Sequence, residues 1–221
     1  MYKRQILGFL SLIGTLPNDP MKLYYAPDTC SLSPHILLRE LDLPFDLVRV
    51  DNHAKRTADG RDFLTINPKG YVAALEVEDG RVLTEGPAIS QYLADLRPEA
   101  GLAPPAGSWG RSQLQEWLNF ISAEIHGGFG ALFNRDLPEA ARAWWQARLE
   151  KRLDYVAAAL HARQALVQDR YGVADIYLYA VLRWAPQLGV DLARWPELAH
   201  FQRRIESRPA VQAALAAEAH A

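Results

Sequence analysis

The stretch MKLYYAPDTCSLSPHILLREL, residues 21–41, decides the fold because its hydrophobic pattern changes around a single cysteine. Residues 22–26 are apolar and β-prone, which predicts a strand that ends before a proline. A Ser-Pro pair follows and predicts a helix over residues 34–41, with Ser33 as its N-cap. We therefore expect a strand, a loop and a helix in that order, with Cys30 in the loop.

Cys30 is the only cysteine among 221 residues, so an intrachain disulfide framework and a cysteine-cluster zinc site are both excluded. A lone cysteine is most often a small buried hydrophobic residue. A thiol at the start of a helix, however, meets the partial positive charge of unpaired amides, which favours the reactive thiolate. We expect Cys30 to be functional, with a lowered pKa.

The composition indicates an ordinary globular protein. Hydrophobic residues make up 49% of the chain and charged residues 23%, and the formal net charge is −2. A net charge this small gives no reason to expect a nucleic acid or an acidic membrane surface as a partner. No metal site is expected.

Residues 1–20 are expected to lie outside the fold. Residues 2–5 are basic and residues 6–13 are mostly apolar, a pattern that resembles a secretory signal. The apolar run is short, lacks a small-residue cleavage site and could not span a bilayer. We interpret residues 1–20 as an N-terminal extension of a cytoplasmic protein. The alternative is a signal peptide, which would place the protein in the periplasm.

Residues 21–100 alternate between strand and helix signals. Strands are expected at residues 22–26, 45–50, 73–77 and 81–84, and helices at 34–41, less clearly 59–66, and 87–96. Asp79-Gly80 between the last two strands is a strong hairpin signal. The order βαβαββα predicts a small mixed sheet covered by helices.

Residues 101–110 are rich in proline and glycine and are expected to link this domain to a second one. In residues 111–221 only helical spacing is found. Helices are expected within residues 114–125, 140–162, 174–184, 195–206 and 210–217. Trp184 and Trp195 are expected in the core. The predicted fold class is α/β plus all-α.

Together, a set of short motifs resembles the bacterial beta-class glutathione transferases over residues 21–218. The motifs are Met21–Pro27 with Cys30–Leu32, Asn67–Gly70, Leu83–Gly86 with Ala88–Ile89 and Gln91–Asp95, Glu116–Phe120, and Val173–Asp175 with Tyr177–Leu178. The resemblance implies a thioredoxin-like N-terminal domain and a helical domain with an electrophile pocket. It also implies glutathione as co-substrate, a small apolar electrophile as substrate, and a homodimer.

The resemblance implies four glutathione-binding positions in the first domain. Glu85 and Gly86 stand where a helix begins and where its amides could bind the γ-glutamyl carboxylate. The backbone of Val72 would pair with the cysteinyl part as an added strand does. Lys55 is the fourth position. Each position also has a purely structural interpretation. Glu85 could merely complement the helix dipole, Val72 could be an ordinary edge residue, and Lys55 could be a solvated lysine.

Two positions in the second domain complete the implied site. Asn119 and His126 are seven residues apart, which places them on one face of an α-helix. Facing the cleft, they could hydrogen-bond the ligand and the Cys30 sulfur, and His126 could stabilise a thiolate or move a proton. His35 is expected to be structural, and so is Asp175, as part of a helix capping box.

Three positions depart from the family pattern. Ala73 replaces a proline that follows a cis bond, which predicts either a trans bond with a reshaped loop or a cis bond retained by packing. Gly172 replaces a hydroxyl N-cap, so restoring a hydroxyl there should raise the melting temperature. Gly127 replaces a basic residue and thins the positive charge around glutathione.

Three functions are compatible with these residues. The first is conjugation of glutathione to an apolar electrophile next to Cys30. The second is thiol–disulfide exchange through a mixed disulfide of Cys30 with glutathione, which suits a Cys-x-x-Ser pattern without a resolving cysteine. The third is a non-catalytic scaffold that binds apolar ligands or a partner and has a weakened glutathione site.

Overall fold

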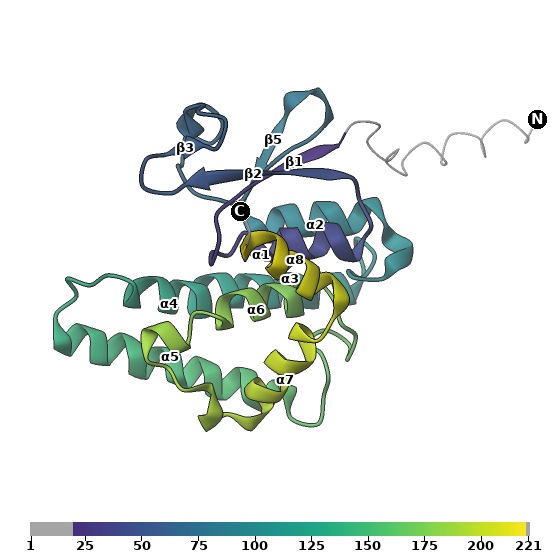
Figure 1. Cartoon of the computed structure of the whole chain (residues 1–221). Coiled ribbons are helices and arrows are strands. Elements are labelled where there is room, and N and C mark those ends of the chain that lie inside the picture. Colours follow the sequence, from purple (N-terminus) through teal and green to yellow (C-terminus); the bar gives the residue numbers. More distant parts are fainter. Residues whose placement is uncertain (1–19, 220–221) are drawn as a thin grey trace, which may run out of the picture.

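A five-stranded mixed sheet in the order β3-β2-β1-β4-β5 organises the first part of the chain (Figure 1). The computed structural model describes residues 20–219, so the expectations for residues 1–19 lie outside the described part. The strands are β1 (Met21–Tyr25), β2 (Phe45–Asp51), β3 (Arg56–Thr57), β4 (Ala74–Glu76) and β5 (Val82–Thr84). β1 runs parallel to β2 and antiparallel to β4, and β4 is antiparallel to β5. The predicted mixed sheet is therefore confirmed.

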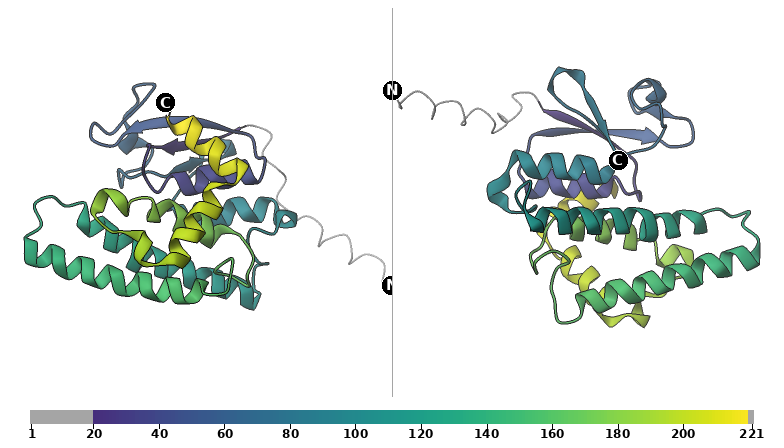
Figure 2. Two further views of the ribbon diagram at one scale, coloured as in Figure 1. Left: turned by 60° about the horizontal axis from the view of Figure 1, so that its bottom comes forward. Right: turned by 180° about the vertical axis from the view of Figure 1, so that it is seen from behind.

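Helices α1 (Leu32–Glu40) and α2 (Gly86–Leu96) lie between the sheet and the helical domain (Figure 2). The other face of the sheet carries a small apolar cluster of Tyr24, Val50, Phe63 and Ala74.

The predicted second helix, over residues 59–66, is wrong. Its place is taken by the short strand β3 and by a 3₁₀ turn, Phe63–Thr65. Phe63 is buried, but the next residue, Leu64, is 46% exposed, so the segment has no continuous apolar face for a helix to pack. Gly60, at φ +85°, also breaks the helical path.

The predicted hairpin is confirmed. Asp79 and Gly80 both have positive φ, as a type I′ turn requires. The Arg81 carbonyl accepts a hydrogen bond from the Val77 N–H at 2.9 Å, and β4 and β5 pair beyond it.

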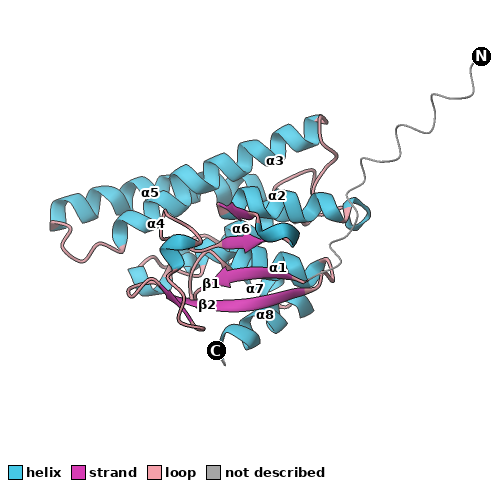
Figure 3. Cartoon of the chain, turned by 90° about the horizontal axis from the view of Figure 1, so that it is seen from above, coloured by secondary structure: helices cyan, strands magenta, loops and turns pink. Residues whose placement is uncertain are grey.

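The second part of the described chain is helical, as predicted (Figure 3). Its helices are α3 (Trp109–Phe120), α4 (Gly127–Leu132), α5 (Glu139–Leu160), α6 (Val173–Leu182), α7 (Pro196–Glu206) and α8 (Pro209–Ala219). A π-helical turn, Ile121–His126, joins α3 to α4. The first two residues of α3, Trp109 and Gly110, fall inside the predicted linker, residues 101–110. The boundaries of the linker stay a prediction. Within residues 20–219, none of the helices has both the length and the apolar character needed to cross a bilayer.

Helix α1 is buried on both sides, because the sheet covers one side, where His35 contacts Tyr25 and Phe45, and helices α6 and α8 cover the other. His35 on this helix is completely buried, and its Nδ1 lies 2.7 Å from Oε1 of Glu218 on α8. Its Nε2 accepts a hydrogen bond from Nε of Arg39 at 2.9 Å. The structural role expected for His35 is therefore to join the C-terminal helix to the first domain.

Asp175 caps the start of α6, in agreement with its expected structural role. Its Oδ2 accepts from the Gly172 N–H and its Oδ1 from the Leu166 N–H, both at 3.0 Å. Burial raises the pKa of Asp175 to about 7, although the two backbone donors act in the opposite direction. The carboxylate thus satisfies two amide groups that would otherwise be buried without a partner.

The expectation that a hydroxyl at position 172 raises stability is wrong. A Cβ added to Gly172 would lie 2.3 Å from the backbone oxygen of Leu102. That oxygen already accepts a hydrogen bond from the Val173 N–H at 2.9 Å. The glycine is required here by the close approach of two backbone segments.

We predict that Gly172→Ser lowers the free energy of unfolding by about 1–3 kcal/mol, as overpacking does. Thermal unfolding should show this as a fall in Tm of about 2–4 °C per kcal/mol. Gly130→Ser is the matched control, because a Cβ at Gly130 in α4 meets nothing within 4 Å. A Tm for Gly172→Ser equal to or above that of the wild type would refute this account.

Candidate functional site

A cavity of about 330 Å³ lies where the first domain meets the π-helical turn and α6. Residues from both domains line it: Thr29, Cys30, Asn52, Asn67, Lys69, Tyr71, Val72, Ala73, Thr84, Glu85, Gly86, Pro87, Ser122, His126, Tyr177 and Trp184. Five of the seven predicted site residues are in this set. The structure thus brings together Cys30, Val72, Glu85, Gly86 and His126.

Cys30 reaches the cavity from the loop between β1 and α1. The N-cap position of α1 is Ser31 and not the predicted Ser33, so the cysteine stands just outside the helix. The Ser31 hydroxyl lies 3.2 Å from both the N–H and the carbonyl oxygen of Ala26, which closes the loop on itself. Thr29 reinforces the loop by donating from its hydroxyl to the same carbonyl at 2.8 Å.

The expected lowering of the Cys30 pKa is wrong for the free protein. Burial raises the pKa of the thiol to about 11, and the charge of Glu85 adds to this effect. The sulfur lies 3.8 Å from the backbone oxygen of Val72, to which the thiol can donate. Desolvation therefore outweighs the favourable position near the start of α1, and the free protein holds a thiol.

The peptide bond between Val72 and Ala73 is cis, so the expected trans bond is wrong and the alternative of a cis bond is confirmed. Val72 and Ala73 both line the cavity. The alanine therefore does not remove the Val72 backbone from the site.

Glu85 and Gly86 form the junction between β5 and α2. Glu85 has a φ of +71°, an uncommon conformation for a residue other than glycine, and it directly precedes the helix. Its Oε1 lies 2.6 Å from Nζ of Lys69, which also donates to the Thr84 hydroxyl at 2.8 Å. The cavity wall thus carries a carboxylate and an ammonium group side by side.

His126 enters from the π-helical turn, opposite the first domain. Its Nδ1 lies 2.7 Å from the Tyr177 hydroxyl, and its ring lies edge-on to Trp184 at 4.9 Å between centroids. Burial lowers the pKa of His126, against an opposing effect of the Glu85 charge, so the ring is neutral at physiological pH. Trp184 in turn donates from Nε1 to the Asp28 carbonyl at 2.8 Å.

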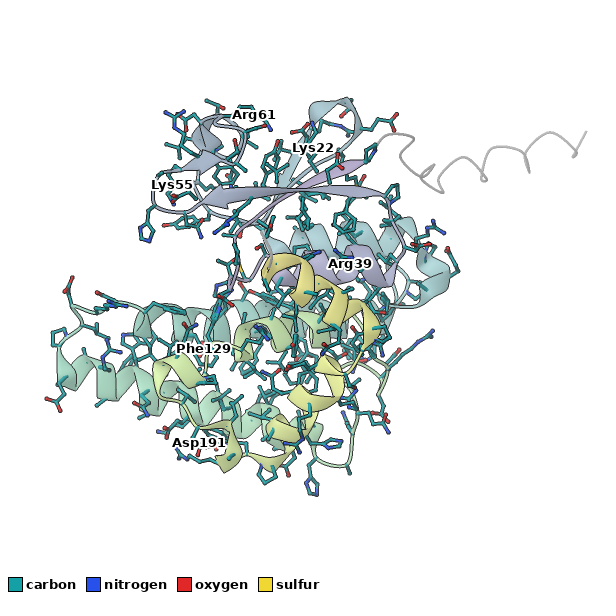
Figure 4. All side chains as sticks on the ribbon, viewed as in Figure 1. Lys22, Arg39, Lys55, Arg61, Phe129 and Asp191 are labelled. Atoms are coloured by element: carbon teal, nitrogen blue, oxygen red, sulfur yellow. The ribbon has the colours of Figure 1, made fainter. Side chains whose placement is uncertain are left out.

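Two predicted residues do not line this cavity. Asn119 is exposed, and its Nδ2 donates to the Gln115 carbonyl at 2.8 Å. A π turn takes more residues than an α turn, so a separation of seven no longer places Asn119 and His126 on one face. Lys55 donates to the Gly70 carbonyl at 2.8 Å and lies at the β3 end of the sheet (Figure 4). The ligand-binding roles of Asn119 and Lys55 stay predictions.

Sequence reasoning missed several residues that line the cavity, notably Lys69, Tyr71, Ser122 and Tyr177. Trp184 is buried as expected but also forms part of the wall. Lys69 and Tyr71 flank the Val72 loop, so their nearness to Val72 was the available signal. Tyr177 lies in a helix that is buried along its whole length, so its pattern does not show which side faces a cavity.

The donor set of the cavity does not suggest a metal centre. Among the residues that the structure describes, no group of three or more histidine, cysteine, aspartate or glutamate side chains could hold a metal ion.

Comparison with known proteins gives matches over most of the chain. Residues 19–95 match the family model "Glutathione S-transferase, N-terminal domain", and residues 120–209 match "Glutathione S-transferase, C-terminal domain". The glutathione S-transferase GstA of Escherichia coli O157:H7 is 46% identical over 198 residues, which cover 90% of this chain and 98% of that protein.

Solved structures agree with these matches. A sphingomonad glutathione S-transferase complexed with glutathione has a TM-score of 0.88 and 42% identity, covering 90% of this chain and all of that one. The bacterial beta-class glutathione S-transferase of Sphingomonas chungbukensis has a TM-score of 0.86 and 40% identity, covering 89% of this chain and 98% of that one.

The raised pKa of Cys30 predicts a slow and strongly pH-dependent reaction with iodoacetamide in the ligand-free protein. Because Cys30 is the only cysteine, the total alkylation rate measures this thiol alone. The rate should keep rising up to a pH of about 10, whereas the rate for a free cysteine peptide levels off above its pKa of about 8.5. A plateau below pH 8 would show that the thiolate is already stabilised in the free protein.

Proposed function

The chain belongs to the glutathione S-transferase family, and we propose that it conjugates glutathione to a small apolar electrophile in the cavity beside Cys30. Its relatives support the beta class within this family. Glutathione is the co-substrate. The observation that carries the proposal is that Cys30, Val72, Glu85 and His126, which come from four separate segments, line one cavity.

We place the tripeptide along the first-domain wall of this cavity. The γ-glutamyl end lies at Glu85 and Gly86. There the ligand's ammonium can pair with the Glu85 carboxylate, and the ligand's carboxylate can accept from the free amides at the start of α2. The cysteinyl backbone pairs with Val72, whose carbonyl oxygen is near the Cys30 sulfur. The glutathione sulfur then lies between Cys30 and His126.

The chemical step is displacement by the glutathione sulfur. Its proton leaves, a new bond forms between sulfur and the electrophilic carbon, and the leaving group departs with the bonding electrons. Neutral His126 is able to accept or relay that proton, and the Tyr177 hydroxyl at 2.7 Å holds its ring in place. Trp184 supplies apolar surface for the electrophile on the same side.

Thiol–disulfide exchange is the second candidate, because the Cys30 sulfur itself faces the cavity. Attack of the Cys30 thiolate on a glutathionylated substrate would form a Cys30–glutathione disulfide and release the substrate thiol. A second glutathione thiolate would then release oxidised glutathione and restore Cys30. The raised pKa of Cys30 in the free protein disfavours this reaction relative to conjugation.

We also propose that the protein acts in the cytoplasm as a homodimer. An aromatic cluster of Trp117, Phe120 and Tyr155 joins α3 to α5, with ring centroids 5.1–5.9 Å apart. Tyr155 is 55% exposed, so this cluster presents aromatic surface that a second copy could cover. A second copy of the chain is the partner that the family resemblance implies.

Titration calorimetry of glutathione into the reduced protein tests the main proposal. We expect a dissociation constant in the micromolar to millimolar range and turnover of 1-chloro-2,4-dinitrobenzene. Cys30→Ser separates the two reactions: exchange should fall by more than about 100-fold, and conjugation by less than about tenfold. If glutathione does not bind while apolar dyes do, the protein is a ligand-binding scaffold and not a transferase.

Sedimentation equilibrium tests the dimer. The wild type should sediment as a dimer at micromolar concentration, and Tyr155→Glu should shift it toward the monomer by placing a charge in the covered surface. Far-UV circular dichroism controls for folding of the variant. A monomeric wild type over this range would contradict the proposal.

A further inference from the structure

Lys69 is the charged residue of the cavity wall that has no part in the proposed function, and it forms an ion pair with Glu85. Lys69 Nζ lies 2.6 Å from Glu85 Oε1 and 2.8 Å from the Thr84 hydroxyl. The two side chains are 52% and 65% exposed. Ion pairs this exposed contribute little stability, so both groups are free to take part in binding a ligand.

The helix start next to this pair is short of donors for a carboxylate. Gly86 offers only its backbone N–H, and Pro87 has none. The Ile89 N–H already donates to the Glu85 carbonyl. In the first turn of α2, only the backbone N–H groups of Gly86 and Ala88 therefore remain to bind an anion.

Lys69 supplies the missing positive charge. Among the described residues that line the cavity, it is the only lysine or arginine, and Glu85 is the only carboxylate. Across the cavity the His126 ring is neutral, and Gly127, which follows it in the chain, has no charged side chain. A ligand carboxylate at this end of the cavity therefore has a single cation to approach.

The γ-glutamyl end of glutathione carries an ammonium and a carboxylate on one carbon atom. An ammonium–carboxylate pair on the protein at 2.6 Å is the complement of such a zwitterion, since each ligand charge meets the opposite charge. A ligand with only one of the two charges would leave one protein group without its partner.

We propose that Lys69 recognises the α-carboxylate of the γ-glutamyl group, next to the ammonium that the proposed function already places at Glu85. This inference rests on the proposed glutathione site and assigns Lys69 as a specificity-determining residue. In the free protein the two side chains pair with each other, and on binding they exchange that contact for contacts with the ligand.

The test compares glutathione with γ-aminobutyryl-cysteinylglycine, which lacks only the α-carboxylate of the γ-glutamyl group. The wild type should bind glutathione more than about tenfold more tightly than the analogue, because Lys69 adds one charge-assisted contact to those of the Gly86 and Ala88 amides. Lys69→Met should bind glutathione about tenfold more weakly than the wild type, and its preference for glutathione over the analogue should fall by the same factor. Lys69→Arg should keep most of the preference.

Lys22→Met is the matched control, because Lys22 forms a similar pair with Glu76 at 2.7 Å on β1 and β4, and neither residue lines the cavity (Figure 4). Its ligand preference should equal that of the wild type. Equal weakening of both ligands in Lys69→Met would mean that Lys69 only orders its loop, and unchanged binding would mean that it does not contact the ligand. Either result overturns the inference while the wild-type affinity for glutathione still supports the proposed function.

Discussion

The burial of α1 on two sides is the constraint on which the rest of the structure depends. Residues Leu32–Leu38 are all buried, because the helix packs against the sheet and against the helices of the second domain. A helix buried all round must be apolar or must satisfy its polar groups internally. His35 is satisfied by Glu218 from the last helix, so the two ends of the described fold meet at α1.

The cavity lies at the same seam, and this explains why its residues are scattered in sequence. The first domain supplies the cysteine loop, the Val72 loop and the start of α2, while the second domain supplies His126 and Trp184. The hydrogen bond from Trp184 to the Asp28 carbonyl holds the cysteine loop from the opposite domain. Geometry around Cys30 is therefore set by domain packing and not by the loop alone.

The sequence was sufficient for four of the five strands of the sheet, for the hairpin and for the helical second domain, because hydrophobic period and turn residues act locally. It failed where distant backbone decides the outcome. The clash of a Cβ at Gly172 with Leu102 depends on a contact across 70 positions. The π turn between Asn119 and His126 cannot be recognised from their separation of seven residues, which predicts one face only if the helix is α throughout. The pKa of Cys30 depends mainly on the burial of its thiol in the folded chain, so the position near a helix start was an incomplete guide.

Charge links the two ends of the cavity. Burial is the main cause of both shifts, raising the pKa of Cys30 and lowering that of His126, and the charge of Glu85 acts to raise each, so its carboxylate adds to the effect that opposes a thiolate in the free protein. A ligand ammonium next to Glu85 offsets that negative charge, and water displaced from the cavity strengthens the remaining interactions. In the complex that we propose, binding of the γ-glutamyl head beside Glu85 would therefore make ionisation of a sulfur in the cavity more favourable than it is in the free protein.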